Sequence, residues 1–228
     1  MIIAAVPVKD LANAKQRLVS ALTTDERAEL ARAMLRDVLK ALAAAGPDLV
    51  WVVTREPAVA AIARTLGAEP LTETENRGHT AAVAFAQAEA SSRGARVFLT
   101  VPGDVPRVTA DELRKLAAAA GPGVPVFVPS RSGLGTNGVA LAPPDAMTLR
   151  FGEPSFDNHL AVARRLGLTS RVLELPGLGL DIDAPDDLAA FVAENDDATE
   201  TGRLLSRWLS EKGRAFLTAA PATPGSQP

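Results

Sequence analysis

Three acidic residues in two separate segments could together hold a divalent cation. Asp104 follows the apolar run 97–101 within Pro-Gly-Asp-Val-Pro, which would put its carboxylate at the carboxyl edge of a sheet, where open α/β sheets bind ligands. Asp181 and Asp183 come after Leu178-Gly179-Leu180. If that segment is a strand, both acids face the same way and can point at one ligand. Since Mg²⁺ prefers hard oxygen ligands, the three acids predict a magnesium site for phosphate chemistry.

Each of these acids also has a structural alternative. An Asp after a strand often caps the next helix, but Thr109 and Asp111 are better placed for that role, which favours a functional Asp104. Asp181 and Asp183 could instead form a turn. Against this, two acids on one strand face repel each other unless a cation or solvent relieves them.

A cationic segment follows the apolar run 2–6, which we predict to be the first strand. Lys9, Lys15 and Arg17 lie within it, where a nucleoside triphosphate would sit in an open α/β sheet. These cations could neutralise its phosphates, although a solvated cationic loop fits the spacing equally well. The segment has neither G-x-G-x-x-G nor G-x-x-x-x-G-K-[ST], which disfavours dinucleotide binding and P-loop hydrolysis.

Two polar segments in the second half of the chain could hold a small anion. The glycine-rich turn 130–138 could form an anion nest from its backbone N–H groups, or be a plain connection. Ser155 begins a predicted helix, where it would be the N-cap, and the amide end of that helix is also an anion site. Thr136, Gly152 and Ser155 could therefore hold a small phosphorylated acid.

Gly78 and Thr80 flank His79 at the start of another predicted helix and could line a nucleotide pocket. His79 and His159 are the two histidines of the chain, and they form no H-x-x-x-H pair, so a zinc hydrolase is disfavoured. The absence of a G-x-S-x-G elbow likewise disfavours Ser-His-Asp catalysis.

The elements that must position these residues alternate between strands and helices. Continuous apolar runs are typical of strands covered on both faces, and they occur at 2–6, 50–53, 97–101, 124–128, 139–141 and 172–175. Helical periodicity predicts helices at 25–45, 57–66, 80–90, 110–119, 156–166, 185–194 and 199–217. This order predicts a three-layer α/β fold with a mostly parallel sheet. We expect one domain over residues 1–217 and a flexible tail over 218–228.

Composition excludes several classes of partner. The formal net charge of −3 gives no electrostatic case for nucleic acid. No apolar run approaches the roughly 20 residues that span a bilayer, and the first residues are predicted to be a strand rather than a signal peptide. The absence of cysteine excludes disulfides and thiolate nucleophiles. We therefore expect a cytoplasmic protein that acts on small molecules.

Several short motifs resemble one enzyme family when their order and spacing are taken together. The chain is similar to the guanylyltransferases of coenzyme F420 biosynthesis, which act on 2-phospho-L-lactate, phosphoenolpyruvate or 3-phospho-D-glycerate. The resemblance covers roughly residues 1–195, and its motifs are Val6-Pro7-Val8-Lys9, Ala14-Lys15-Gln16-Arg17-Leu18, Met34-Leu35-Arg36-Asp37-Val38-Leu39, Pro102-Gly103-Asp104-Val105-Pro106, Arg150-Phe151-Gly152 with Ser155-Phe156, and Leu180-Asp181-Ile182-Asp183.

The resemblance implies a Rossmann-like nucleotidyltransferase fold of the GT-A-like type, GTP as substrate and Mg²⁺ as cofactor. By matching motif, it implies metal ligands at Asp104, Asp181 and Asp183, binding of the phosphorylated acid by Thr136, Gly152 and Ser155, and phosphate-facing catalytic cations at Lys9, Lys15 and Arg17. We assign nucleotide binding to Lys9, Lys15, Gly78 and Thr80. Coupling to a downstream transferase with a deazaflavin acceptor is also implied, and the oligomeric state stays open, a homodimer included.

The expected reaction joins GMP from GTP to the phosphorylated acid and releases pyrophosphate. The acceptor phosphate is already anionic near pH 7, so positioning and electrostatics should supply most of the rate. Two alternatives remain at this stage. One is a glycosyltransferase of related fold, with Asp181-Ile182-Asp183 as a D-x-D motif, and the other is a non-catalytic nucleotide-binding module.

Overall fold

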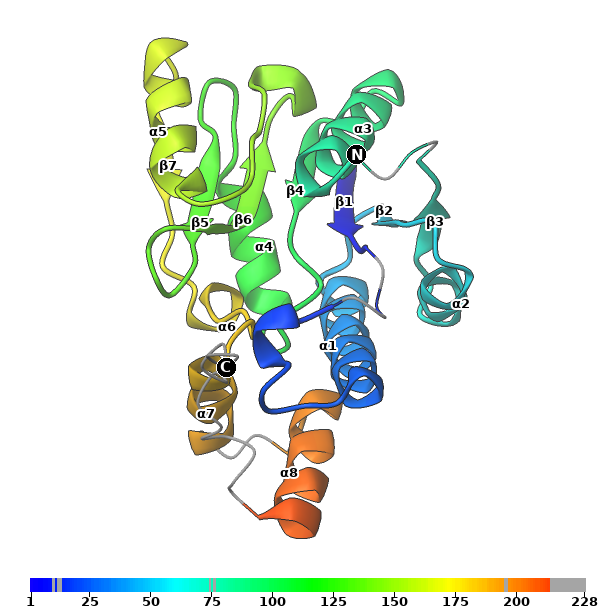
Figure 1. Ribbon diagram of the computed structural model, residues 1–228. Helices are drawn as coiled ribbons and strands as arrows, with labels where there is room; N and C mark the ends of the chain where they lie inside the picture. The colour runs from blue at the N-terminus through cyan, green and yellow to red at the C-terminus, as the bar shows by residue number, and fades with distance from the viewer. Residues whose placement is uncertain (10, 12–13, 74, 76, 195–196, 214–228) are drawn as a thin grey trace, which may run out of the picture.

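A seven-stranded sheet forms the centre of the computed structural model, which describes residues 1–9, 11, 14–73, 75, 77–194 and 197–213 (Figure 1). The strand order is β3-β2-β1-β4-β6-β5-β7. β6 runs antiparallel to its neighbours β4 and β5, and the other paired strands are parallel. The predicted mostly parallel sheet is therefore confirmed. The strands are β1 (Ile2–Pro7), β2 (Leu49–Val53), β3 (Glu69–Leu71), β4 (Val97–Thr100), β5 (Val126–Pro129), β6 (Thr136–Leu141) and β7 (Arg171–Val172).

Helices cover both faces of the sheet and make three layers. Because side chains alternate along a strand, Ala4 and Val6 of β1 join one apolar cluster while Ile3 and Ala5 join the other. The second cluster includes residues of α3 (His79–Ser92) and α5 (Ser155–Arg165). The first includes residues of α1 (Thr24–Ala45), α2 (Pro57–Thr65), α4 (Ala110–Ala119), α6 (Pro176–Gly179), α7 (Pro185–Ala193) and α8 (Glu200–Lys212).

The predicted helices are present, with ends that differ from the predicted ones by at most a few residues over the described part of the chain. Thr23 and Glu26 form a capping box at the start of α1, and Thr109 caps α4, as expected. Residues 214–217 of the last predicted helix lie outside the described residues, as does the predicted tail. Sequence periodicity missed the short elements, which are β3, α6 and two 3₁₀ turns at Gln16–Leu18 and Pro144–Ala146.

The predicted strand before Asp181 is wrong. Leu178 and Gly179 belong to α6, and the residues that follow form no strand. What brings this segment to the sheet edge is a backbone hydrogen bond of 3.1 Å from the Ile182 N–H to the Asp104 carbonyl. Ile182 is fully buried, so its packing holds the two flanking acids at the protein surface beside Asp104. None of the helices in the described part of the chain has the length and apolar character to cross a bilayer.

Asp37 on α1 fixes the start of α8. Its buried carboxylate accepts hydrogen bonds from the backbone N–H groups of Glu200 and Thr201, at 2.7 and 2.8 Å, and from the Thr201 hydroxyl at 2.7 Å. Burial raises the pKa of Asp37, and these bonds oppose the rise. We expect Asp37→Ala to lower the free energy of unfolding by about 2 kcal/mol, because two buried donors lose their acceptor.

Urea unfolding at pH 7 measures this effect. Glu29→Ala is the matched control, because Glu29 joins the same two helices through an exposed ion pair with Arg207. That variant should stay within about 0.5 kcal/mol of the wild type. Equal unfolding midpoints for Asp37→Ala and the wild type would contradict the role given to Asp37.

Candidate active site

A lysine and two aspartates meet at the carboxyl edge of the sheet. Lys15 comes from the segment after β1, Asp104 from the segment after the adjacent parallel strand β4, and Asp183 from the segment before α7. The Lys15 Nζ lies 2.5 Å from the Asp104 Oδ2 and 2.6 Å from the Asp183 Oδ1. The fold therefore brings together two predicted metal ligands and one predicted catalytic cation.

Lys15 is held in an unusual conformation. Its backbone φ of 56° lies in the left-handed region, which non-glycine residues rarely adopt, and its side chain is only 7% exposed. Burial by itself lowers the pKa of Lys15, but the charges of Asp104 and Asp183 outweigh burial and raise the pKa above its ordinary value. The ammonium is therefore charged near pH 7. Strain of this kind persists where the surrounding structure imposes it, commonly at functional sites.

Asp181 lies near the same cluster and is oriented by β6. Asn137 donates through Nδ2 to the Asp181 Oδ1 at 3.0 Å and to the Gly179 carbonyl at 3.1 Å. Burial raises the pKa of Asp181, the Asn137 bond opposes the rise, and the charges of Asp104 and Asp183 add to it. For Asp183, burial again raises the pKa, but Lys15 outweighs it and the pKa is lowered. Two carboxylates thus pair with one buried lysine and a third lies near them, which favours a further cation.

The donor types fit a hard cation such as Mg²⁺. The Asp104 Oδ1 is buried and has no hydrogen-bond partner among the described residues, which leaves an acceptor unused at a cost in free energy. No group of three or more His, Asp or Glu residues in the described ranges is close enough to form a complete metal site. Lys15 stands between Asp104 and Asp183, so a metal there would require this ammonium to move.

Two of the other predicted nucleotide-binding residues, Lys9 and Gly78, lie at two adjoining cavities. Lys9, Lys15 and Asp104 border a cavity of about 240 Å³ that is also lined by Ala31, Met34 and Leu35 of α1. Lys9 also borders a second cavity of about 360 Å³, beside β2. A Cβ added at Gly78 would lie 3.6 Å from the Lys9 Nζ, so Gly78 is close to both. Arg17 is exposed, and its charge helps to lower the pKa of Asp183.

The predicted acid-binding residues form a second polar cluster, on the α5 side of the sheet. The Ser155 hydroxyl donates to the Thr136 Oγ1 at 3.2 Å. The prediction that Ser155 is the N-cap of this helix is wrong. Pro154 takes that position, and Ser155 is the first helical residue, with its side chain turned towards β6. Gly152 has a φ of 109°, a conformation that favours glycine. Thr136 and Asn137 are consecutive on β6, at a shift in its register with β5, and their partners lie on opposite sides of the sheet: His159 on α5 for Thr136, and Gly179 and Asp181 for Asn137.

Two side chains hold the backbone that leads to Gly152. Thr80 accepts from the Phe151 N–H through Oγ1 at 2.9 Å, and His159 accepts from the Arg150 N–H through Nε2 at 3.0 Å. Thr80 therefore contacts the segment proposed to bind the acid, and its predicted contact with the nucleotide stays a prediction. His159 had no predicted role beyond its part in disfavouring a zinc hydrolase, since a lone histidine inside a helix carries no distinctive spacing.

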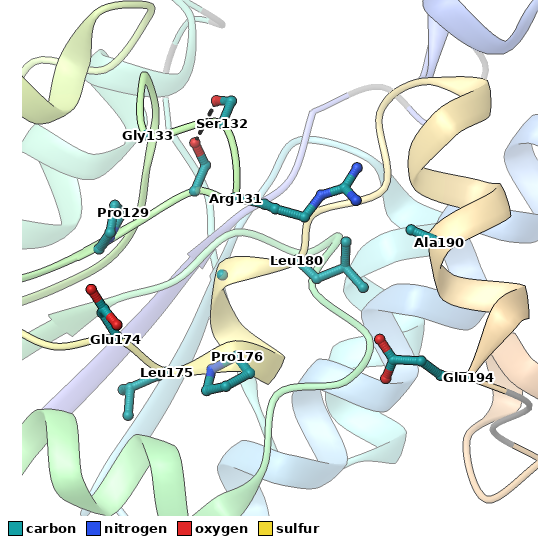
Figure 2. Close-up of a pocket in the computed structure, with 12 residues that line it drawn as sticks. Pro129, Arg131, Ser132, Gly133, Glu174, Leu175, Pro176, Leu180, Ala190 and Glu194 are labelled. Carbon is teal, nitrogen blue, oxygen red and sulfur yellow. Dashed lines mark hydrogen bonds between the residues drawn. The ribbon is translucent and has the colours of Figure 1, made fainter.

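Cavity size alone does not locate this site. A cavity of about 530 Å³ lies between the segment 129–133, α6 and α7, and Figure 2 shows Arg131 extending across it towards Ala190. Its lining contains none of the predicted site residues.

The chain can now be compared with known proteins. A family model described as "Guanylyl transferase CofC like" matches residues 2–210. The chain belongs to this family. A protein of Rubrobacter xylanophilus named phosphoenolpyruvate guanylyltransferase is 40% identical over 193 residues, which cover 84% of this chain and 94% of that protein. A protein of the same name from Sphaerobacter thermophilus is 42% identical over 187 residues, covering 82% of this chain and 90% of that protein.

Solved structures confirm the nucleotidyltransferase fold for this CofC-like guanylyl transferase. One described as a nucleotide-diphospho-sugar transferase, from Desulfovibrio desulfuricans G20, has a TM-score of 0.75 at 17% identity and covers 95% of this chain and 96% of its own. A nucleotidyl transferase from Methanothermobacter has a TM-score of 0.62 at 19% identity, covering 85% of this chain and 97% of its own. At these identities the likeness shows the fold alone.

Of the two alternatives for the turn 130–138 of this CofC-like chain, an anion nest or a plain connection, the hydrogen bonds favour the connection. The Arg131 N–H donates to the Gly179 carbonyl, and the Gly133 N–H donates to the Ser130 carbonyl. The Leu134 and Gly135 N–H groups donate to the hydroxyls of Ser132 and Ser130. These donors are used inside the protein, so the loop fixes the start of β6 rather than binding an anion.

Two histidines with lowered pKa values should make the stability of the protein fall in mild acid. Burial lowers the pKa of His79 and of His159 from the ordinary value of 6.5 to about 4. Between these values the unfolded chain binds more protons, so the contribution of each histidine to stability is complete above pH 6.5 and is lost as the pH falls towards 4. We expect a lower free energy of unfolding at pH 5.5 than at pH 7, measured with urea. His159→Asn should reduce this difference, and an unchanged difference would contradict the assignment.

Proposed function

We propose that this CofC-like guanylyl transferase transfers GMP from GTP to phosphoenolpyruvate and releases pyrophosphate, with Mg²⁺ as cofactor, in coenzyme F420 biosynthesis. The observation that carries the proposal is the carboxyl-edge cluster, in which Lys15 bridges Asp104 and Asp183 and the Asp104 Oδ1 has no hydrogen-bond partner among the described residues. Of the three candidate acids, phosphoenolpyruvate is favoured by the names of the relatives.

The reaction needs one bond to form and one to break. A phosphate oxygen of the acid attacks the α-phosphorus of GTP, and the bond from that phosphorus to the bridging oxygen of the β-phosphate breaks. The second pKa of a phosphate monoester is about 6, so the attacking oxygen is anionic at pH 7 and needs no strong general base. The chain therefore has to bring two anions together and stabilise the leaving pyrophosphate.

The proposed roles follow from charge and position. Lys9, Lys15 and Arg17 would stabilise the charge on the leaving pyrophosphate. Asp104, Asp181 and Asp183 would hold Mg²⁺, whose chemistry here is the neutralisation of phosphate charge. Thr136, Gly152 and Ser155 would bind the acid on the α5 side of β6, and Gly78 and Thr80 would border the nucleotide.

Pyrophosphate release from the purified protein tests the proposal. Phosphoenolpyruvate, 2-phospho-L-lactate and 3-phospho-D-glycerate are each offered with GTP and Mg²⁺, and the downstream transferase with its deazaflavin acceptor is added to draw the product away. We expect release with phosphoenolpyruvate, loss of release with EDTA, and recovery with excess Mg²⁺. No pyrophosphate release with any of the three acids, from a folded protein that binds GTP, would overturn the proposal.

A further inference from the structure

A buried histidine links the residues that are proposed to bind the phosphorylated acid. His159 on α5 is 1% exposed. Its ring stacks on Phe127, with centroids 5.5 Å apart, and meets Phe151 edge-on at 5.2 Å. Although these neighbours are aromatic, both ring nitrogens have polar partners. One nitrogen faces the Arg150 N–H and the other faces Thr136.

The hydrogen bonds determine which nitrogen carries the proton. The Arg150 backbone N–H can only donate, so the Nε2 that it faces at 3.0 Å must be an acceptor without a proton. Burial keeps the pKa of His159 at about 4, so the ring is neutral near pH 7. Its single N–H proton is then on Nδ1, which donates to the Thr136 Oγ1 at 3.0 Å.

The Thr136 hydroxyl can then form only one further hydrogen bond, as a donor. Its oxygen accepts from the His159 Nδ1–H and from the Ser155 hydroxyl, and these two bonds occupy both of its lone pairs. The hydroxyl hydrogen must therefore donate to a third group. Among the described residues no acceptor for this hydrogen is present, and an anionic oxygen of a ligand would be a strong one.

The same histidine also holds a second donor in place. The N–H groups of Arg150 and Phe151 bind His159 and Thr80, and the Gly152 N–H that follows has no partner among the described residues. Through Nε2, His159 thus anchors the backbone that leads to the Gly152 N–H. Through Nδ1, it orients the Thr136 hydroxyl.

We propose that His159 is a positioning residue, whose Nδ1–H turns the Thr136 hydroxyl so that this hydroxyl donates to an oxygen of the phosphorylated acid. The identity of the acid rests on the proposed function, whereas the state of the ring does not. The competing explanation is a histidine that only packs between Phe127 and Phe151.

Nitrogen-15 NMR of the histidine rings tests the first step without turnover. The chain has two histidines, so a His79→Asn protein assigns the remaining signals to His159. We expect a neutral ring at pH 7 with the proton on Nδ1. A proton on Nε2, or a charged ring, would overturn the proposal.

Two substitutions test the second step, because each replaces one nitrogen. The Asn amide in His159→Asn stands near the Nδ1 position and keeps a donor for Thr136. The Gln amide in His159→Gln reaches the Nε2 position and keeps an acceptor for the Arg150 N–H, but loses the donor. With Mg²⁺, GTP and phosphoenolpyruvate, we expect His159→Gln to raise the KM for the acid at least about tenfold and His159→Asn to stay within about threefold. The KM for GTP should not change in either variant.

The outcomes separate this inference from the proposed function. Equal losses in both variants, or a rise in both KM values, would indicate that His159 only packs and would overturn the inference. An unchanged KM for the acid in His159→Gln would overturn it as well. Wild-type protein that turns over none of the three acids would instead overturn the proposed function, and with it the role of Thr136 towards the acid, whatever the NMR result.

Discussion

Asp104→Asn is expected to lower the kcat for pyrophosphate release by about a hundredfold or more while the protein stays folded. The change removes the charge of a carboxylate that faces Lys15 at 2.5 Å and whose second oxygen has no partner in the described part of the chain. An amide of the same shape preserves the packing but is a weaker ligand for a hard cation and a weaker partner for the ammonium. The kcat with saturating GTP and phosphoenolpyruvate, together with a thermal melt, measures both effects.

A matched control for this variant lies at the start of α4. Asp111 is exposed and pairs with Arg114, so Asp111→Asn makes the same change in charge a few residues away from the cluster. That variant should keep its kcat within about twofold, since surface substitutions away from a site usually have small effects. A fully active Asp104→Asn protein would exclude Asp104 from metal binding.

Lys15→Met should abolish most of the activity and also destabilise the protein. Removing one partner from a buried ion pair costs about 3–5 kcal/mol, and we expect about 2 kcal/mol here, because the Asp183 side chain is 44% exposed. With the ammonium gone, Asp104 and Asp183 face each other and Asp181 without a cation between them. Added Mg²⁺ should therefore raise the Tm of Lys15→Met more than that of the wild type, because binding to the folded state stabilises it.

Lys40→Met is the control for Lys15→Met. Lys40 pairs with Glu200 and its side chain is 50% exposed, so its loss should change stability by less than about 1 kcal/mol and leave the response to Mg²⁺ unchanged. Thermal melts of both variants at a series of Mg²⁺ concentrations make the comparison. If Mg²⁺ raises the Tm of Lys15→Met no more than that of the wild type, the placement of Lys15 at the cation site is wrong.

Much of the framework could be predicted because its signals are local. The continuous apolar runs of β1 and β4 indicate buried strands, and the turn after β4 places Asp104 at the sheet edge, whereas the pairing of the two strands is known only from the structure. The antiparallel direction of β6 could also be predicted, from the length of the connection before it. Only six residues, 130–135, separate β5 from β6, and so short a connection joins antiparallel strands, since a parallel pair needs a crossover of a dozen or more.

The contacts that complete the site could not be predicted, because they depend on tertiary structure. Leu178 and Leu180 fit a strand as well as a short helix, so the acids after them were given the wrong local structure. The pairing of Lys15 with Asp104 joins residues 89 positions apart, through a backbone conformation that the sequence does not indicate. His159 likewise acquires its partners from β6 and from the loop before α5 only after folding.

The two consecutive residues of β6 have a consequence for how the family can diverge. Thr136 faces the α5 side and Asn137 holds Asp181, so one strand serves both halves of the site. β6 has one residue more than β5 at this point, because Val128 lies opposite Gly138 and Pro129 lies opposite Thr136. Deleting that residue would restore regular alternation and remove one of the two contacts. New acid preferences in this lineage should therefore arise by substitution within β6, whereas changes in chain length should accumulate in the preceding loop, 130–135.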